Sequence, residues 1–260
     1  MHMSRVPVCQ ACLESIHPVE GPLCAACGER LVSRFAGPEN KFHSERDGSP
    51  LCLACLQNEP VFSRAAAHGS YDGGLREMIH LLKYERVRPA AAVLGRMLAE
   101  VVADVAEAFG PEAPVIMAVP LHASKMRQRG FNQSELIARA MLKLKPAALD
   151  VKLNTTALVR SRATESQTGL TPPQRRENVR GAFKVVRSDQ ITGRDILLVD
   201  DVFTTGTTAS ECARVLRRAG AARVFVVTVA RVLKPEAERV EIDQVEPAEE
   251  EARRVMAAKA

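Results

Sequence analysis

The stretch ILLVDDVFTTGTTASECARVL, residues 196–216, places four kinds of residue in a fixed order. An apolar run leads into Asp200 and Asp201, a threonine-rich turn around Gly206 follows, and apolar residues then recur at helical spacing. This order predicts a buried strand, a tight loop and an amphipathic helix. Ligands of open parallel α/β sheets bind beyond the carboxyl ends of the strands, so the loop is a candidate binding site.

The loop between the predicted strand and helix has the composition of a phosphate site. A helix N-terminus presents unpaired N–H groups and partial positive charge, and Gly206 permits a tight turn. The carboxylates of Asp200 and Asp201 can accept hydrogen bonds from sugar hydroxyls. A phosphorylated sugar suits both halves, and the loop lacks the glycine patterns of triphosphatases and dinucleotide folds. The alternative is a plain strand–turn–helix. Hydroxyl donors come from Thr204, Thr205, Thr207 and Thr208.

Strands and helices alternate along the central part of the chain. Asn132 and Glu135 are spaced as a capping box at the start of one predicted helix. Cys212 takes an apolar position in the helix after the phosphate loop and is expected in the core. This alternation predicts an α/β fold with a parallel sheet covered by helices. Besides the opening stretch, we expect helices over 75–82, 93–105 and 132–144 and strands over 115–119 and 223–231.

The composition indicates a globular protein with an aliphatic core: the 260 residues are 46% hydrophobic and include no Trp. No apolar run approaches the ~18 residues of a membrane span, and the N-terminus lacks the apolar segment of a signal peptide, so we expect a cytoplasmic protein. Three regions follow from composition. Residues 1–60 are a cysteine-rich module, residues 61–231 the α/β domain, and residues 232–260 a charged tail expected to be a frayed helix or disordered.

Six of the seven cysteines form three C-x-x-C pairs in the first region. Each pair can hold one side of a tetrahedral zinc ion, and a reducing compartment disfavours disulfides. A redox dithiol is the alternative, although the βαβ context of such motifs is missing. The first two pairs and the last two make equally good quartets, and a second site would need His17, His43 or water. The pairs are Cys9/Cys12, Cys24/Cys27 and Cys52/Cys55.

Two further segments carry polar residues that suit a phosphorylated ligand. Lys125, Arg127 and Arg129 follow the strand expected over 115–119, where cations match a pyrophosphate. Residues 158–183 form a long polar segment without apolar periodicity, which is typical of a functional loop. We expect this segment to be a mobile loop that closes over a ligand.

The segment LLVDDVFTTGTT resembles the phosphoribosyl pyrophosphate (PRPP) signature of type I phosphoribosyltransferases. Together with the cysteine pairs, four other segments resemble the ComF/GntX family, which combines a double zinc ribbon with a phosphoribosyltransferase-like domain. The resemblance covers residues 9–231, but many members carry four cysteine pairs and this chain has three. The four segments are YDGGLREMIHLLKYE, PLHASKMRQRGFNQS, RSRATESQTGL and RRENVRGAF.

The resemblance implies a type I phosphoribosyltransferase fold with a small N-terminal zinc ribbon. Asp200 and Asp201 would be the catalytic residues, with their carboxylates on the ribose hydroxyls. Residues 204–208 would bind the 5′-phosphate, and the pyrophosphate would be bound by Lys125, Arg127 and Arg129. Mg²⁺ would accompany PRPP, and Zn²⁺ would be structural. Family motif residues in the flexible loop are Arg160, Arg162, Thr164, Gln167, Arg176 and Asn178.

Three functions remain open at this point. The family implies a PRPP-binding protein with Mg²⁺ in natural competence, DNA uptake or DNA processing, with single-stranded DNA or competence proteins as partners. The alternatives are a metabolic phosphoribosyltransferase and a nonenzymatic adaptor that senses PRPP or binds DNA. Residues 125–187 hold fourteen Lys and Arg against four Asp and Glu, which suits a DNA backbone. Their only aromatics are Phe131 and Phe183, so base stacking has weak support.

Overall fold

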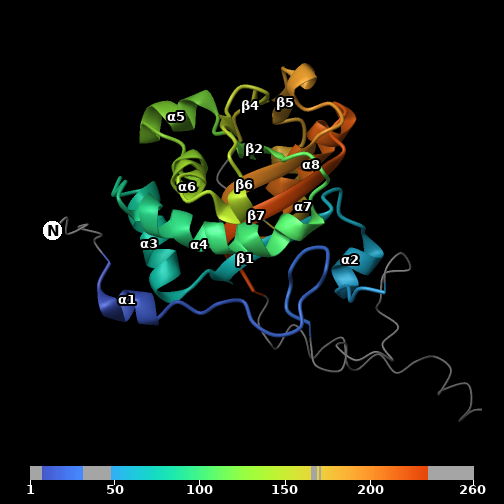
Figure 1. Ribbon diagram of the computed structural model, residues 1–260. Helices are drawn as coiled ribbons and strands as arrows, with labels where there is room; N and C mark the ends of the chain where they lie inside the picture. The colour runs from blue at the N-terminus through green and yellow to red at the C-terminus, as the bar shows by residue number, and fades with distance from the viewer. Residues whose placement is uncertain (1–7, 32–47, 165–168, 170, 234–260) are drawn as a thin grey trace, which may run out of the picture.

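A five-stranded parallel sheet lies at the centre of the computed structural model (Figure 1), which describes residues 8–31, 48–164, 169 and 171–233. Adjacent strands of this sheet all run parallel, which confirms the predicted fold class. The strand order is β1 (Arg64–Ser70), β7 (Arg223–Arg231), β6 (Asp195–Phe203), β2 (Val115–Ala118) and β3 (Leu153–Asn154).

Helices cover both faces of the sheet because its central strands are apolar on both sides. In β6, Leu197 and Val199 pack toward one face, and Ile196 and Leu198 toward the other, as the two-residue period of a strand requires. The first face is covered by α3 (Gly73–Lys83), α4 (Ala90–Val105) and α6 (Gln133–Leu142). The second face is covered by α8 (Thr207–Arg218), against which α7 (Pro172–Val179) packs.

Most elements predicted in the α/β region are present with small changes of bounds. Asn132 caps α6 by accepting a hydrogen bond from the backbone of Ser134, but the carboxylate of Glu135 pairs with Arg139 instead of completing a capping box. Strand β1 was not predicted, because its sequence RAAAHGS is rich in alanine, a weak strand former. Cys212 is fully buried in the core, as expected.

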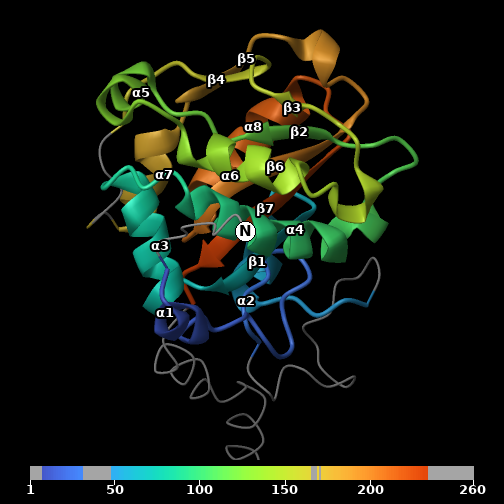
Figure 2. The same cartoon turned by 60° about the vertical axis from the view of Figure 1, so that its left-hand side comes forward.

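The segment 158–183 is not the plain loop that its polar sequence predicts. It contains β4 (Leu158–Arg160) and α7 and leads into β5 (Phe183–Val185), and β4 and β5 pair as an antiparallel ribbon. Figures 1 and 2 show this ribbon outside the main sheet, at the end of the molecule where α5 (Ala123–Arg129) lies. The apolar side chains of Leu158, Val179 and Phe183 anchor the segment to the core beside α8, which explains its regular structure.

The N-terminal region packs along the edge of the sheet formed by β1. It contains α1 (Gln10–Glu14) and α2 (Leu53–Gln57), and Pro18 forms a bridge with Gly69 of β1. The backbone N–H of Ala65 also donates to the carbonyl of Ala26 at 2.7 Å. The expectation for residues 234–260 lies outside the described residues. Among the described residues, no helix combines the length and the apolar character needed to cross a membrane.

Candidate functional site

Strand β6 carries the two acidic residues at the centre of the candidate site. The strand continues past them to Phe203, because Val202 and Phe203 still pair with β7, so the acids lie within the strand and not at its end. Ser134 Oγ donates to Asp200 Oδ1 at 2.9 Å, and Gln133 Nε2 donates to Asp201 Oδ1 at 3.3 Å. Both donors belong to the first turn of α6, which therefore orients the carboxylates.

The Lys83 ammonium forms an ion pair with Asp201 Oδ2. Lys83 is the last residue of α3, whose buried apolar side chains fix the helix against the core. The Lys83 side chain is 17% exposed and that of Asp201 is 7% exposed, so water screens the pair only weakly. A cation that the sequence did not indicate thus lies within the predicted ribose clamp.

The surroundings of the two carboxyl groups shift their pKa values in opposite directions. Burial, together with the charge of Asp201, raises the pKa of Asp200 to about 8. Burial also opposes ionisation of Asp201, but the Lys83 ammonium outweighs it and lowers the pKa of Asp201. Burial likewise acts against the charge of Lys83, and its contact with Asp201 still raises the pKa of Lys83. In the ligand-free protein, Asp201 therefore holds the negative charge and Asp200 favours the protonated form.

The predicted phosphate loop lies directly beyond the acidic pair and opens into α8. Gly206 is the N-cap of α8, with a positive φ of 70°. A Cβ at this position would lie 2.6 Å from the Phe203 ring, so both the backbone and the packing require glycine. Thr204 and Thr205 are exposed, and the hydroxyls of Thr205 and Thr207 are hydrogen-bonded at 2.7 Å. The loop therefore presents hydroxyls and a helix N-terminus at the position that the sequence predicts.

The structure places the three predicted pyrophosphate residues on α5 and links one of them to the acidic pair. Lys125 and Arg127 are exposed on this helix. Arg129 donates to Gln133 Oε1, the side chain that also contacts Asp201. A chain of contacts thus runs from Arg129 through Gln133 to Asp201. His122 caps this helix by accepting a hydrogen bond from the Ser124 backbone.

The predicted flexible-loop residues separate into different roles. Burial lowers the pKa of Arg160, and the nearby Asp200 carboxyl opposes this effect when it is ionised. The Arg160 guanidinium also lies over the Phe183 ring, 5.2 Å from its centroid. Arg160 also contacts the hydroxyl of Thr164. Arg162 instead donates to the backbone carbonyls of Asn178 and Arg180, which satisfies the C-terminal end of α7. Arg176 is exposed on α7, and Gln167 lies outside the described residues.

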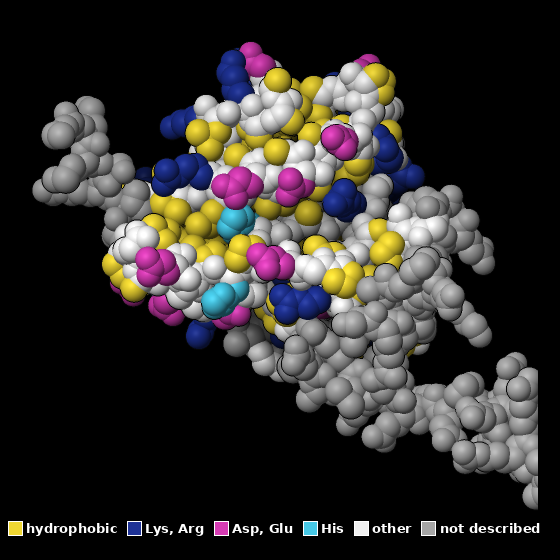
Figure 3. Space-filling view, turned by 60° about the horizontal axis from the view of Figure 1, so that its bottom comes forward, with side chains coloured by type: hydrophobic (Ala, Val, Ile, Leu, Met, Phe, Trp, Pro, Cys, Tyr) yellow, Lys and Arg dark blue, Asp and Glu magenta, His cyan; other side chains and the backbone are white. Residues whose placement is uncertain are grey.

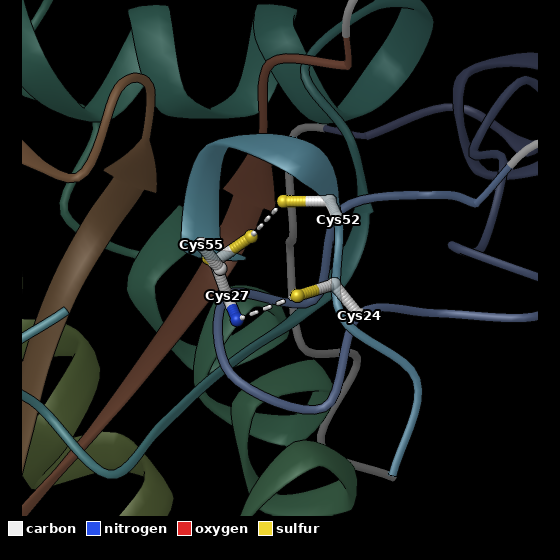
Figure 4. Close-up of side chains that lie close together, drawn as sticks. All are labelled: Cys24, Cys27, Cys52 and Cys55. Carbon is white, nitrogen blue, oxygen red and sulfur yellow. Dashed lines mark hydrogen bonds between the residues drawn. The ribbon is translucent and has the colours of Figure 1, made fainter. Parts of the chain in front are cut away.

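Four of the six N-terminal cysteines converge on one point. Figure 4 shows Cys24 and Cys27 facing Cys52 and Cys55 at the start of α2. Their Sγ atoms all lie within 4.8 Å of one another. Cys27 Sγ and Cys52 Sγ are 3.7 Å apart, close to the ~3.8 Å that follows from tetrahedral Zn–S bonds of about 2.3 Å. The quartet therefore fits a tetrahedral metal, and the structure selects it from the two that the sequence left open.

The thiols of this quartet hydrogen-bond to one another and share their protons unequally. Hydrogen bonds with the other three thiols lower the pKa of Cys24 and raise that of Cys55, and hydrogen bonds with Cys24 and Cys52 raise the pKa of Cys27. Cys24 is therefore the thiol that most favours the thiolate, the form that binds zinc. Cys9 and Cys12 lie apart from the quartet at the start of α1, with their Sγ atoms 3.4 Å from each other. Within the described ranges, His17 is not grouped with them, and His43 lies outside those ranges.

A buried arginine connects the cysteine cluster with the phosphate loop. Arg231, the last residue of β7, pairs with Glu29 at 3.0 Å and donates to the carbonyl of Cys27 at 2.6 Å. Its guanidinium also stacks on Phe203, 5.3 Å from the ring centroid. Phe203 in turn packs against Gly206. A continuous set of contacts therefore joins the metal-ligand segment to the start of α8.

Comparison with known proteins places this arrangement in a family. The DNA utilization protein YhgH of Escherichia coli O157:H7 is 36% identical over 183 residues, which are 70% of this chain and 78% of the relative. The chain belongs to the ComF family. Competence protein F of Haemophilus influenzae is 28% identical to this ComF-family chain over 229 residues, covering 86% and 96% of the two proteins.

The phosphoribosyl transferase domain family matches residues 128–250 of the chain. A solved hypoxanthine phosphoribosyltransferase from Staphylococcus aureus is 15% identical, with a TM-score of 0.31, over 53% of this chain and 62% of its own. The family match and the parallel sheet together show a phosphoribosyltransferase-like domain that follows an N-terminal four-cysteine cluster.

Three side chains at the acidic pair were missed by sequence reasoning. Lys83 directly follows the helix expected over 75–82, a common position for lysine. Gln133 and Ser134 were assigned only to the first turn of a helix. The polar run NQS at a helix start, just after the predicted pyrophosphate residues, was the available signal. Their contact with the acids depends on the packing of α6 against β6.

Proposed function

We propose that this ComF-family chain binds PRPP with Mg²⁺ at the acidic pair and phosphate loop of β6, and that it acts in the uptake or processing of DNA. The observation that carries the proposal is the contiguity of the site. Two oriented carboxylates are followed within the same segment by a glycine-permitted turn at the N-terminus of a 12-residue helix. Such a helix end favours a phosphate, and carboxylates accept hydrogen bonds from vicinal hydroxyls.

The residues around the acidic pair suit the second anionic group of PRPP as well. Arg129 is connected to Asp201 through Gln133, and Arg160 interacts electrostatically with Asp200. Such cations would complement a diphosphate attached to the anomeric carbon. Mg²⁺, when bound, would neutralise diphosphate charge. The chain's own contribution is to hold the ribose between the phosphate loop and these cations, with an orientation fixed by α6.

Zinc is the metal that best suits the four-cysteine cluster, because four thiolates form a closed structural site. Cys24, Cys27, Cys52 and Cys55 would hold it, and its role would be to fold the N-terminal region. Zinc at this position would order the segment whose carbonyl and carboxylate contact Arg231.

The DNA role is proposed from the names of the relatives and from the charge of this chain. Two relatives are named for DNA utilization and for competence. The basic excess of residues 125–187 includes exposed cations on α5 and α7. On the face shown in Figure 3, by contrast, acidic and basic side chains are interspersed. We therefore place DNA binding near α5 and α7, through backbone charge and not through base stacking.

The PRPP proposal is tested by isothermal titration of the zinc-loaded protein with PRPP in the presence and absence of Mg²⁺. We expect saturable binding that Mg²⁺ strengthens, and weaker binding by Asp200→Asn and Asp201→Asn at unchanged zinc content. Pyrophosphate release over a panel of nucleobase and amine acceptors then separates a transferase from a PRPP-sensing protein. Absence of PRPP binding at millimolar concentration would overturn the proposal.

The DNA proposal needs its own measurement, because PRPP binding does not depend on it. We expect single-stranded DNA to bind with an affinity that falls steeply with salt, since each neutralised phosphate releases a counterion. Replacing Lys125 and Arg127 by Gln should reduce both the affinity and the salt slope. Binding that is undetectable or independent of salt would contradict a DNA-contacting role and favour a metabolic one.

A further inference from the structure

Two side chains contact the buried carboxylate of Asp201. The Lys83 ammonium pairs with Oδ2, and Gln133 Nε2 donates to Oδ1. A carboxylate that receives two protein donors has less capacity to accept hydroxyls from a ribose. A sugar that binds at this carboxylate must therefore displace or rearrange one of these donors.

The residues that follow Lys83 contact the helix that carries the cations predicted to bind pyrophosphate. Arg86 donates through Nη2 to the carbonyl of Gln128 on α5 at 2.9 Å. The guanidinium of Arg129 lies 5.7 Å from the centroid of the Tyr84 ring. The C-terminal end of α3 and the C-terminal end of α5 therefore form one wall. Lys83 and Arg129 approach Asp201 from this wall, one directly and one through Gln133.

We propose that Lys83 is a diphosphate-binding residue. Its ammonium pairs with Asp201 in the ligand-free protein and pairs with the diphosphate instead when PRPP binds. This inference rests on the proposed function. The transfer exchanges one buried anion for another, so Lys83 keeps a counter-ion in both states and no unpaired charge is left on it. Release of Asp201 then makes its carboxylate available to the ribose hydroxyls. Lys83 thereby couples recognition of the diphosphate to opening of the ribose clamp.

A lysine that serves only as a counter-ion of Asp201 would behave differently. Its removal would affect every ribose ligand alike, because it would act through the shape and charge of Asp201. If the Lys83 ammonium binds the diphosphate, its removal should instead weaken the binding of PRPP selectively. The comparison between PRPP and ribose 5-phosphate isolates the diphosphate, since the two share the sugar and the 5′-phosphate.

The test is calorimetric titration of PRPP and of ribose 5-phosphate, each with Mg²⁺, into the full chain and into Lys83→Met and Lys83→Arg. We expect Lys83→Met to weaken PRPP binding about tenfold or more, the usual cost of losing a charge-assisted hydrogen bond. Ribose 5-phosphate binding should be unchanged or stronger, and Lys83→Arg should recover part of the PRPP affinity. Lys143→Met is the matched control, since Lys143 is exposed at the end of α6.

The outcomes separate this inference from the proposed function. Wild-type protein that does not bind PRPP contradicts the proposed function itself. Wild-type protein that binds PRPP, with equal losses for both ligands in Lys83→Met, overturns the role of Lys83 alone. Should Lys83→Met not fold, the side-chain ¹⁵N resonance of Lys83 in the wild-type protein decides, with Lys83→Arg used to assign it. We expect it to shift on addition of PRPP and not of ribose 5-phosphate, and an unchanged resonance at saturating PRPP overturns the inference.

Discussion

The cysteine cluster and the acidic pair both gather like groups that repel when ionised, but they solve this problem in different ways. Four cysteine thiols converge on one point, where a bound metal would balance the charge of their thiolates. Asp200 and Asp201 carry their own balance, because Lys83 compensates one carboxylate and burial keeps the other protonated. A structural site can keep its metal permanently. A site that binds and releases a ligand needs a protein group, here Lys83, to balance its charge when the ligand is absent.

The largest effect should come from breaking the cluster. Cys24→Ser removes one of four ligands, and structural zinc sites are worth about 10 kcal/mol or more. We expect the variant to lose the zinc of the quartet and to expose residues 48–57 to proteolysis, as measured by metal analysis and limited digestion. Cys12→Ser is the control, because Cys12 lies outside the quartet and should leave its zinc in place. Equal zinc in Cys24→Ser and wild-type protein would show that the quartet is not the metal site.

The second effect tests whether the two sites are connected. Arg231→Met leaves the largely buried Glu29 without its partner, and breaking a buried ion pair costs about 3 kcal/mol. We expect a loss of this size in the free energy of unfolding by denaturant titration. The double variant with Glu29→Gln should recover part of it, because the unpaired charge is then gone. A single-variant loss below about 0.5 kcal/mol would mean that the connection contributes nothing to stability.

Gly206 offers a sharper test within the phosphate loop. Gly206→Ala combines a positive φ with a Cβ in contact with Phe203, whereas Gly193 has a similar φ of 71° and open space around it. We expect Gly193→Ala to cost about 1 kcal/mol and Gly206→Ala about 2 kcal/mol. Only Gly206→Ala should weaken PRPP binding, as measured by calorimetry. Identical losses in stability and affinity would remove the steric argument for this glycine.

The smallest effect concerns the protonation of Asp200. Its folded pKa is raised to about 8, so the stability that its protonated form contributes is fully present below the unfolded pKa and lost as pH rises through the folded value. Wild-type protein should therefore lose stability as pH rises from about 4 to about 8 and level off above that, with about 1 kcal/mol of the loss between pH 7 and pH 9. Asp200→Asn stays neutral and should remove this part of the loss. Parallel wild-type and variant profiles of unfolding free energy against pH would contradict the raised pKa.

The sequence predicted those parts of the molecule whose structure depends on residues adjacent in the sequence. The strand, loop and helix of residues 196–216 follow from a contiguous pattern, and the structure has all three. The cysteine spacing predicted pairs, but three equal pairs could not indicate which two share a site. Lys83 and Ser134 reach the acids only because α3 and α6 pack on the same face of the sheet, which no local pattern specifies. The polar segment 158–183 contains a strand and a helix and leads into a second strand. Its few apolar residues, which pack against the core, are too widely spaced to predict these elements.

If the loop after Asp201 holds the 5′-phosphate of PRPP, ³¹P NMR of PRPP with Mg²⁺ should detect the contact. The monophosphate resonance reports on this loop separately from the diphosphate resonances. We predict that it shifts on addition of wild-type protein and of Gly193→Ala, and that it stays near its free position with Gly206→Ala. A monophosphate resonance that does not move with wild-type protein at saturation, or that moves equally with Gly206→Ala, would show that this loop does not hold the 5′-phosphate.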